Sequence, residues 1–513
     1  MEGVVVMDSI NITDAQKWIN AVKEKSGFSG QGLKEDAICN LDAQLFPSSF
    51  KTIGPDQLVI AKLSAGNALA VIGVNALGFD GIKLSTGENF IYFCLMNNPN
   101  AEIIRKSFKF TNPVALSDKD VTFGLGDRLG CASPGHIRLF KNKNAYPVLA
   151  QQSVRELDLT KRNYQDVFDS ACWAVFQEGY EEPWGADGDH LKTEDWVKTA
   201  LEIGFTMITA DVSDYIINKY NNEQESVIME DYNKLSAAYR NEIESEYLNL
   251  SIKLDTEDTI SYTKESLAKI VLIYKDAIDY ALTLYNVGIN MNKQFDFEFS
   301  IDETDTPTLP EAHFFVANEA KKKGIKISSL APRFIGEFQK GIDYIGNLDE
   351  FEESFKKHAA IARYFGYRIS VHSGSDKFMV FPSIGKYTNK KFHIKTAGTN
   401  WLQSLEIISE LEKVFFRKLY KFALEVFPIA REYYHITPNM ENVPDIDSLN
   451  DSELPMLFKN NDVRQVLHVT YGEILKNEDF KCEFYKIIGK NIESYWHSLE
   501  KHIGKHLDLL GIN

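Results

Sequence analysis

Cysteine is scarce in this chain. The five cysteines, Cys39, Cys94, Cys131, Cys172 and Cys482, lie far apart, and no two form a Cys-x-x-Cys pair. Disulfide scaffolds and thiolate zinc sites both need regularly spaced cysteines. We therefore exclude both and expect reduced thiols in the core.

Long apolar runs are also missing. No stretch approaches the roughly 20 uninterrupted apolar residues that cross a bilayer, so we expect no membrane insertion. The first eight residues, Met1–Asp8, contain no basic segment followed by an apolar one and no small-residue cleavage site. They lack the pattern of a secretory signal. These absences predict a soluble, cytoplasmic protein.

Positive charge is in deficit, with 56 Lys and Arg against 73 Asp and Glu and a formal net charge of −17. A surface of this sign repels phosphate backbones, so nucleic acid is excluded as a partner. A small anionic substrate is compatible with this balance, because local lysines and arginines can form a positive patch inside an acidic protein. Composition indicates no oligomeric state.

Short apolar or β-branched runs alternate with long helical patterns from about Val121 onward. This is the pattern of a parallel sheet covered by helices. Eight strands of this kind predict an α/β fold, a closed (β/α)8 TIM-type barrel. The Gly-Asp-rich third run is poor strand material. The expected strands are Thr122–Arg128, Pro147–Ser153, Trp184–His190, Phe205–Asp211, Phe295–Asp302, Ile325–Ala331, Tyr367–Ser373 and Phe392–Ala397.

Three further segments flank or interrupt the barrel, which we place at residues 121–400. Residues 1–120 mix an expected helix at Asp14–Lys25 with β-rich runs and are interpreted as an N-terminal α+β subdomain. Residues 215–290 are polar and helical in pattern, with helical runs at Ser226–Leu248 and Thr263–Tyr285, which indicates an insertion after the fourth strand. Residues 401–513 are almost wholly helical, including the amphipathic run Leu402–Phe427, and are interpreted as a C-terminal extension.

Four expected strands end in polar residues, and in a barrel such ends form the mouth where catalysis takes place. On one of them, alternation places Glu298, Ser300 and Asp302 on one face, opposite an aromatic face. A carboxylate inside a barrel must be paired, hydrogen-bonded or metal-bound. Glu298 is the better ligand candidate because it is the deeper one. Asp302 either joins the site or only caps the turn that follows.

A histidine ends another of these strands. His372 shares a face with Ser370 and precedes a Ser-Gly-Ser turn that lets the backbone approach a ligand closely. A lone strand histidine is often a hydrogen-bonded core residue. Its position after a carboxylate strand favours metal binding here, and imidazole with carboxylate suits Zn, Mn, Co, Ni or Fe(II) better than Ca or Mg.

Two more strand ends carry ionisable pairs. His393 and Lys395 share a face, and Lys395 is a candidate for holding a substrate carboxylate or, as the alternative, for forming a Schiff base. Asp189 and His190 stand between glycines and lysine, and alternation lets only one of them face the site unless the strand is broken there.

Basic residues near glycine-rich turns are candidate anion contacts. Arg128 follows a glycine-rich turn that lacks the spacing of a nucleotide loop. Arg333 and Lys340 lie after the sixth strand. Structural ion pairs explain each of these residues equally well when it is taken alone.

Several motifs taken together resemble the tagaturonate epimerase family, over nearly the whole chain from Val121. The motifs are Gly126–Gly130, Gly185–Thr193, Ser300–Thr304, Gly336–Tyr344 and His372–Phe378. The resemblance implies the interconversion of D-tagaturonate and D-fructuronate in hexuronate catabolism, with a divalent metal ion. These sugars differ at C4 counted from the hydroxymethyl end, which is carbon 3 counted from the carboxylate.

That position constrains the mechanism. The C4 hydrogen is α to neither the ketone nor the carboxylate, so enolisation cannot remove it. Retro-aldol cleavage of the C3–C4 bond and re-addition on the other face would invert C4. A metal-dependent sugar aldolase or isomerase on a TIM-type barrel is the alternative enzyme class, and a catalytically dead sugar-binding barrel is the non-enzymatic one.

The resemblance suggests roles for these side chains. Glu298 and His372 would bind the metal, with His190 or His393 completing the set, and the metal would act as a Lewis acid. Acid and base groups must serve opposite faces of C4, and they would come from Glu156, Asp189 and Asp302. Lys395, Arg333 or Lys377 would hold the substrate carboxylate. The remaining candidate substrate contacts are Arg128, Lys340, Asp376 and Asn400.

Overall fold

Eight parallel strands close into a barrel in the computed structural model, which describes residues 10–26, 33–64, 66–85 and 90–512. The last strand pairs back with the first, with Ile394 opposite Phe123. This confirms the predicted (β/α)8 barrel, including its Gly-Asp-rich third strand. In chain order the strands are β6 (Val121–Leu125), β7 (Tyr146–Ser153), β8 (Gly185–Leu191), β9 (Met207–Asp211), β12 (Asp296–Ile301), β13 (Ser329–Pro332), β14 (Arg368–Val371) and β15 (Phe392–Thr396).

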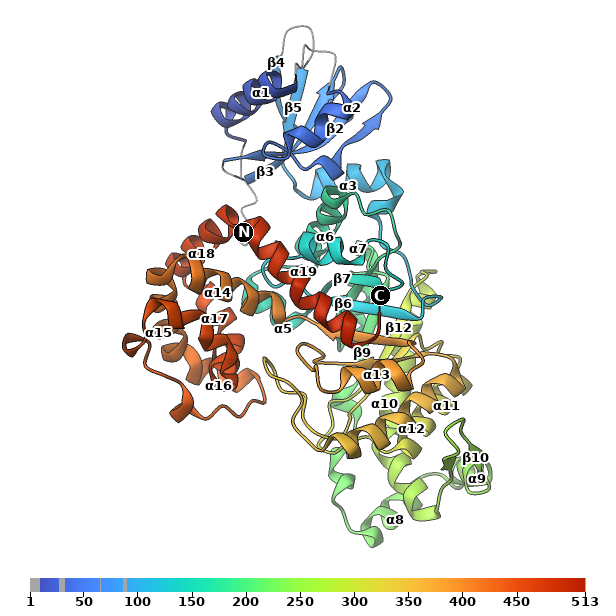
Figure 1. Cartoon of the computed structure of the whole chain (residues 1–513). Helices are drawn as coiled ribbons and strands as arrows, with labels where there is room; N and C mark the ends of the chain where they lie inside the picture. Colours follow the sequence, from blue (N-terminus) through green and yellow to red (C-terminus); the bar gives the residue numbers. More distant parts are fainter. Residues whose placement is uncertain (1–9, 27–32, 65, 86–89, 513) are drawn as a thin grey trace.

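Helices cover the outside of the barrel. The last helix of the chain, α19, packs against both α4 and α13, so it occupies the place of the eighth covering helix (Figure 1). A segment more than 90 residues beyond the last strand therefore completes the barrel layer. The covering helices are α4 (Ser133–Phe140), α6 (Tyr164–Glu178), α7 (Glu194–Ile203), α10 (Lys264–Asn290), α11 (Pro310–Lys322), α12 (Leu348–Phe365), α13 (Phe381–Tyr387) and α19 (Ile492–Leu509).

Alternation along β12 explains how the barrel separates its two faces. Phe297, Phe299 and Ile301 are fully buried and belong to the apolar layer between strands and helices. Tyr285 of α10 meets the Phe297 ring edge-on, with the ring centroids 5.2 Å apart. Glu298 takes the alternate position and lies inside the barrel, where it pairs with side chains of other strands.

Polar side chains fill much of the barrel interior, where branched apolar residues are usual. The members are at most 4% exposed and come from seven of the eight strands. Such a group is stable only if its members pair with one another. They are Thr122, Asp187, Thr209, Glu298, Ser329, Ser370, His393 and Lys395.

The N-terminal part of the chain forms a five-stranded antiparallel sheet in the order β1-β2-β3-β5-β4. The expected helix at Asp14–Lys25 is α1 (Ile12–Ser26), and it packs on this sheet through Trp18 against Phe93. α3 (Asn98–Ser107) then leads toward the barrel and packs on α6. The strands are β1 (Lys51–Ile53), β2 (Asp56–Leu63), β3 (Gly66–Gly73), β4 (Gly81–Ser85) and β5 (Phe90–Cys94).

The insertion after β9 contains two short helices and a two-stranded hairpin before α10. α8 (Glu225–Lys234) and α9 (Ala237–Tyr247) replace the single helical run that the sequence indicated, and they are separated at Leu235 and Ser236. The Ser236 hydroxyl accepts a hydrogen bond from the Tyr239 backbone N–H and begins α9 as its N-cap. The hairpin consists of β10 (Ile252–Lys253) and β11 (Thr259–Ile260).

Helices dominate the chain after β15 and lie beside the barrel in Figure 1. The expected run Leu402–Phe427 is broken at Glu412, where the backbone leaves the helical region. No helix among the described residues combines the length and apolarity needed to cross a bilayer. The helices before α19 are α14 (Thr399–Leu411), α15 (Lys413–Ala430), α16 (Asn461–Val469), α17 (Tyr471–Lys476) and α18 (Glu478–Lys490); α2 (Glu35–Ile38) and α5 (Val154–Thr160) are short.

Candidate active site

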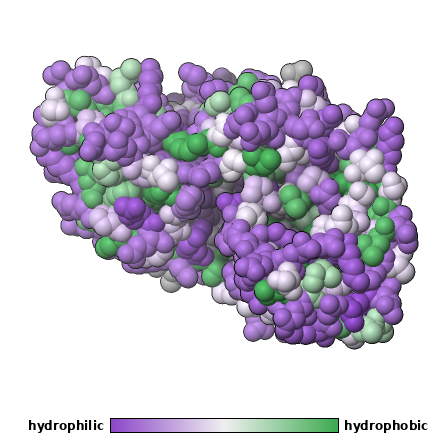
Figure 2. Space-filling view, turned by 90° about the horizontal axis from the view of Figure 1, so that it is seen from below, coloured by the Kyte–Doolittle hydropathy of each residue, from purple (hydrophilic) through white to green (hydrophobic). Residues whose placement is uncertain are grey.

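A cavity of about 680 Å³ opens at the C-terminal ends of the barrel strands. Seven of the eight strands or their following loops contribute to its wall. The helical C-terminal part supplies the rest through Tyr433, Tyr434, His435 and His468. Figure 2 shows the molecule hollowed between two lobes. A concave polar site of this size at the mouth of a barrel suits a small, polar substrate.

Lys395 stands at the floor of the cavity among three carboxylates. Its Nζ lies 2.6 Å from Asp189 Oδ1, 2.9 Å from Asp187 Oδ2 and 2.9 Å from Glu298 Oε1. It also donates to the hydroxyl of Thr209. Burial opposes the charge of Lys395, but the three carboxylates outweigh it and raise its pKa well above the usual value. All N–H donors of its ammonium therefore have partners within the protein.

The carboxylates around Lys395 differ in protonation. Burial raises the pKa of Asp187 to about 6, because the neighbouring Asp189 and Glu298 charges reinforce burial against the attraction of Lys395. Burial also acts on Asp189, but Lys395 and His190 outweigh it and lower the pKa of Asp189 to about 2. Asp189 is thus a fixed anion at the edge of the cavity.

His372 bridges two carboxylates at the end of β14. Its Nε2 lies 2.8 Å from Glu298 Oε1, and its Nδ1 lies 3.1 Å from Asp302 Oδ2. Burial favours the neutral ring, but Asp302 and Glu298 overcome it and raise the pKa of His372 to about 10. Ser300 donates to Asp302 at 2.5 Å and helps to orient it.

The strand β8 is broken where Asp189 and His190 stand. The pairing register with β9 shifts between Gly188 and Leu191, and His190 has a left-handed backbone with φ of 53°. Because of this break, Asp189 and His190 both line the cavity, which regular alternation forbids. His190 Nδ1 lies 3.3 Å from Asp211 Oδ2, and the rings of His190 and His372 have centroids 5.1 Å apart.

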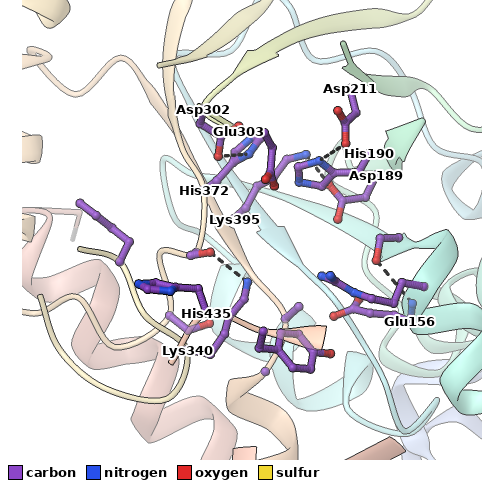
Figure 3. A pocket seen from close by; sticks show the side chains of 18 of the residues that line it. Glu156, Asp189, His190, Asp211, Asp302, Glu303, Lys340, His372, Lys395 and His435 are labelled. Atoms are coloured by element: carbon purple, nitrogen blue, oxygen red, sulfur yellow. Dashed lines mark hydrogen bonds and ion pairs between the residues drawn. The ribbon is translucent and has the colours of Figure 1, made fainter. Parts of the chain in front are cut away.

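The labelled side chains of Figure 3 fall into two groups on opposite sides of the cavity. Lys340, His435 and Glu156 lie apart from the group that contains the two histidines. Lys340 donates to Ser373 Oγ at 2.9 Å, and burial together with the charge of Arg128 lowers its pKa. Within the described part of the chain, the guanidinium of Arg333 has no hydrogen bond or ion pair, although Arg333 lines the cavity.

Arg128 and Glu156 form a buried ion pair next to the second group. Arg128 Nε donates to Glu156 Oε1 at 2.8 Å, and the guanidinium stacks on Tyr471 with 4.3 Å to the ring centroid. Arg128 itself does not line the cavity, so it acts behind the wall. Glu156 does line it, and its Oε2 is buried without a hydrogen-bond partner.

Four sequence-based candidates lie elsewhere or are already bonded. His393 Nδ1 shares a hydrogen bond of 2.9 Å with Thr122 Oγ1 deeper in the barrel, and His393 does not line the cavity. Asn400 donates to the Gly126 carbonyl behind the wall. Lys377 lines the cavity, but its Nζ donates to three backbone carbonyls. Asp376 faces α19, where it pairs with His502, and it also pairs with Arg464. We therefore remove these four from the candidate substrate or metal contacts.

Glu298 is also displaced from its expected role. It is fully buried and does not line the cavity, and both of its oxygens are bonded, Oε2 accepting from Ser329 at 2.6 Å. A divalent ion on Oε1 would stand beside the Lys395 ammonium and be repelled. Glu298 thus orients His372 and Lys395 from behind.

The model of the tagaturonate epimerase family matches residues 46–510. The chain belongs to this family. The sequence-based assignment to it, and to epimerases that act on sugar acids, is thereby confirmed.

Relatives of known name agree with this membership. A tagaturonate/fructuronate epimerase of Thermotoga maritima is 39% identical over 473 residues, which cover 91% of this chain and 97% of the relative. The glycerol-bound crystal structure of the fructuronate-tagaturonate epimerase UxaE from Cohnella laeviribosi is 42% identical, with a TM-score of 0.89, and covers 93% of this chain and 99% of its own. The native crystal structure of that protein has the same TM-score at 41% identity and the same coverage.

The donor set at the barrel mouth suits the divalent metal that the family resemblance implies. His190 and His372 each face a carboxylate, Asp211 and Asp302, and all four line the cavity. Two imidazoles with carboxylates are typical ligands of Zn, Mn, Co, Ni or Fe(II). The buried Nδ1 of His372 has an ion-pair contact but no hydrogen bond. By the chemistry of its donors, this set fits the metal.

Another group of potential ligands lies outside the cavity. Among the described residues, three donor atoms approach within 4.8 Å of one another only at Asp376, His502 and His506. There Arg464 donates to Asp376 at 2.7 Å, and the Asp376 backbone N–H donates to His506 at 3.1 Å. These bonds tie α19 to the barrel and leave this group a structural one.

Among the residues of the cavity region, sequence reasoning did not single out Asp211, Asp187 or His468. Asp211 ends the expected strand Phe205–Asp211, and that position was the available indication. Asp187 precedes Asp189 by two positions and so shares its face by alternation. His468 stands more than 70 residues beyond the last strand, which ends at Thr396, and no local pattern connects it with the cavity.

Proposed function

We propose that this protein interconverts D-tagaturonate and D-fructuronate by inverting C4, with a divalent metal and through retro-aldol cleavage. The named activity of relatives that are 39–42% identical over more than 90% of the chain supports the substrate pair. The observation that carries the proposal is the arrangement of the cavity: Asp302 lies beside the two histidines on one side, and Glu156 and Lys340 lie on the other (Figure 3).

The chemistry needs two groups that exchange protons with the C4 oxygen. A base removes the C4 hydroxyl proton, the C3–C4 bond breaks, and its electron pair passes to the C3 side as an enediolate. C4 becomes the carbon of an aldehyde, and the aldehyde fragment rotates so that its other face meets the enediolate. The electron pair then returns to the other face of C4, and an acid protonates the new C4 oxygen, so the atoms of the sugar are unchanged and C4 is inverted.

Glu156 and Asp302 are the two proton-transfer groups in this proposal. They lie on opposite sides of the cavity in Figure 3, as the two faces of C4 require. The Oε2 atom of Glu156 has no hydrogen-bond partner, and Asp302 forms an ion pair with His372. Asp189 is held as an anion by Lys395 and instead orients that lysine and His190.

The substrate carboxylate lies against Lys340 and Arg333. Lys395 and Lys377 have no donor left for it, because three carboxylates and three carbonyls occupy them. Lys340 donates only to Ser373, and Arg333 is unpaired within the described residues. A charge-assisted hydrogen bond to the carboxylate is stronger than a bond between neutral groups.

His190 and His372, with Asp211, would hold the metal. A divalent ion there supplies Lewis-acid stabilisation of negative charge on the ketose oxygens. Chelation with EDTA is expected to abolish the conversion of D-tagaturonate to D-fructuronate, and added divalent metals should restore it to different extents. Full activity of a protein shown to be metal-free by elemental analysis would contradict the metal dependence.

Product analysis tests the retro-aldol step. With D-tagaturonate, we expect D-fructuronate and no release of three-carbon fragments. Release of free three-carbon products would indicate an aldolase instead. Incorporation of solvent deuterium at C4 would show that the C4–H bond breaks, which retro-aldol chemistry does not do.

A further inference from the structure

His468 reaches the cavity from the helical C-terminal part of the chain. It belongs to α16, is 1% exposed and lines the cavity wall. Gly398 and Gly341, which also line the cavity, leave room for its ring. A Cβ at Gly398 would lie 1.9 Å from His468 Cε1, and one at Gly341 would lie 3.1 Å from His468 Cβ. The fold thus makes space for an imidazole here.

The hydrogen bonds of His468 fix its tautomer. Arg128 Nη1 lies 3.4 Å from His468 Nε2, and a guanidinium can only donate, so Nε2 accepts. A neutral imidazole then carries its proton on Nδ1. Nδ1 is buried and has no hydrogen-bond partner. An unpartnered N–H donor in a cavity wall is costly unless a ligand completes it.

The charges around His468 keep it neutral and favour an anion. Burial, then the positive charges of Arg128 and Lys340, lower its pKa well below the usual value. The charge of Asp376 raises the pKa of His468, and the charge of Arg464 lowers it further. A neutral ring among cations can donate to an anionic oxygen without adding charge of its own.

We propose that His468 binds the substrate, donating its Nδ1–H to a carboxylate oxygen of the ketohexuronate that Lys340 holds. This inference rests on the proposed function, since it adds a residue to the carboxylate contacts given there. It makes the C-terminal helical part a component of the active site. It also makes His468 a determinant of the preference for hexuronates over neutral ketohexoses.

A pair of amide variants separates the two ring nitrogens. In His468→Asn the side-chain N–H stands where Nδ1 was, while in His468→Gln the amide stands where Nε2 was. We expect KM for D-tagaturonate to stay within about threefold of wild type in His468→Asn and to rise about 10- to 100-fold in His468→Gln, the loss expected for one hydrogen bond to a charged group.

The neutral ketohexose D-tagatose, which lacks the carboxylate, is the substrate control. Its inhibition constant against D-tagaturonate should be the same in wild type and both variants. A His497→Phe variant, which changes an exposed histidine of α19, should leave KM unchanged. Thermal unfolding verifies that all variants fold.

Two outcomes would overturn the inference. An equal loss for D-tagatose and D-tagaturonate would show that His468 only supports the wall, and a milder effect of Gln than of Asn would show that it acts only through Arg128. Failure of the wild type to convert either hexuronate would reject the proposed function instead. Calorimetric titration of the three proteins with D-tagaturonate would still test the binding role of His468.

Discussion

Asp211 is the residue whose part in the site the structure reveals most directly. It faces His190 across 3.3 Å, and the interaction with His190 holds the pKa of Asp211 below its usual value against the opposing effect of burial. The partner of a functional histidine fixes its ring orientation and its tautomer. Asp211 therefore belongs to the site although it was not among the residues expected there.

We expect Asp211→Asn to lower kcat about 10- to 100-fold, the usual effect of removing the carboxylate partner of a functional histidine. The fold should persist, because the amide retains the shape of the side chain. Steady-state kinetics and circular dichroism provide the measurement. Asp214→Asn is the matched control, since Asp214 follows the same strand but has a side chain that is 68% exposed. Equal kcat in wild type and Asp211→Asn would refute the role.

At the scale of elements, α19 closes the helical layer of the barrel by lying directly on α4. Gly135 of α4 meets the backbone of Trp496, because an added Cβ would lie 2.9 Å from Trp496 Cα and 3.1 Å from its carbonyl oxygen. Trp496 in turn donates its indole N–H to the Cys131 carbonyl at 2.7 Å. Only glycine permits this approach of the two helices.

Gly135→Ala is expected to destabilise the protein by about 1–3 kcal/mol, because backbone atoms of α19 must move. The free energy of unfolding from urea titration measures it. Gly489→Ala in α18 is the control, since nothing lies within 4 Å of its Cβ position. That variant should be neutral or stabilised by up to about 1 kcal/mol. Equal stability of Gly135→Ala and wild type would show that α19 does not depend on this contact.

Also at this scale, most elements could be predicted from the sequence, and the exceptions have local physical causes. Alternation identified β12, with Phe297 outside and Glu298 inside. The two helices of the insertion were taken as one, because the Ser236 cap lies within an otherwise continuous helical pattern. Alternation also left open whether Asp189 or His190 faces the site, and the left-handed backbone at His190 places both there.

At the scale of the whole molecule, several histidines are buried in neutral form. Burial lowers the pKa of His136 and His358 to about 4 and that of His393 and His506 to about 3. In the unfolded chain these groups titrate near 6.5. Below that pH the unfolded chain binds protons that the folded protein does not.

The free energy of unfolding should therefore fall as the pH falls from about 6.5 toward 4. Above pH 6.5 the contribution of these histidines to stability is complete. The expected loss is up to about 1.4 kcal/mol per buried histidine for each pH unit. Urea unfolding of the metal-free protein at pH 7, 6 and 5 measures it, and His358→Phe should have a shallower slope. A free energy that is constant from pH 7 to 5 would contradict the neutral burial of these histidines.

The sequence alone determined the barrel and the ionisable strand ends, because alternation and turn chemistry act between residues close in the chain, and its motifs indicated the family by resemblance. The tertiary structure decided which of those residues line the cavity. Glu298 lies behind Lys395 and His393 lies deeper than the cavity, because closure of the barrel sets the depth of each side chain. His468 lines the cavity wall and contacts Arg128, which lies 340 positions away in the chain. A contact across that separation depends on how the helices pack.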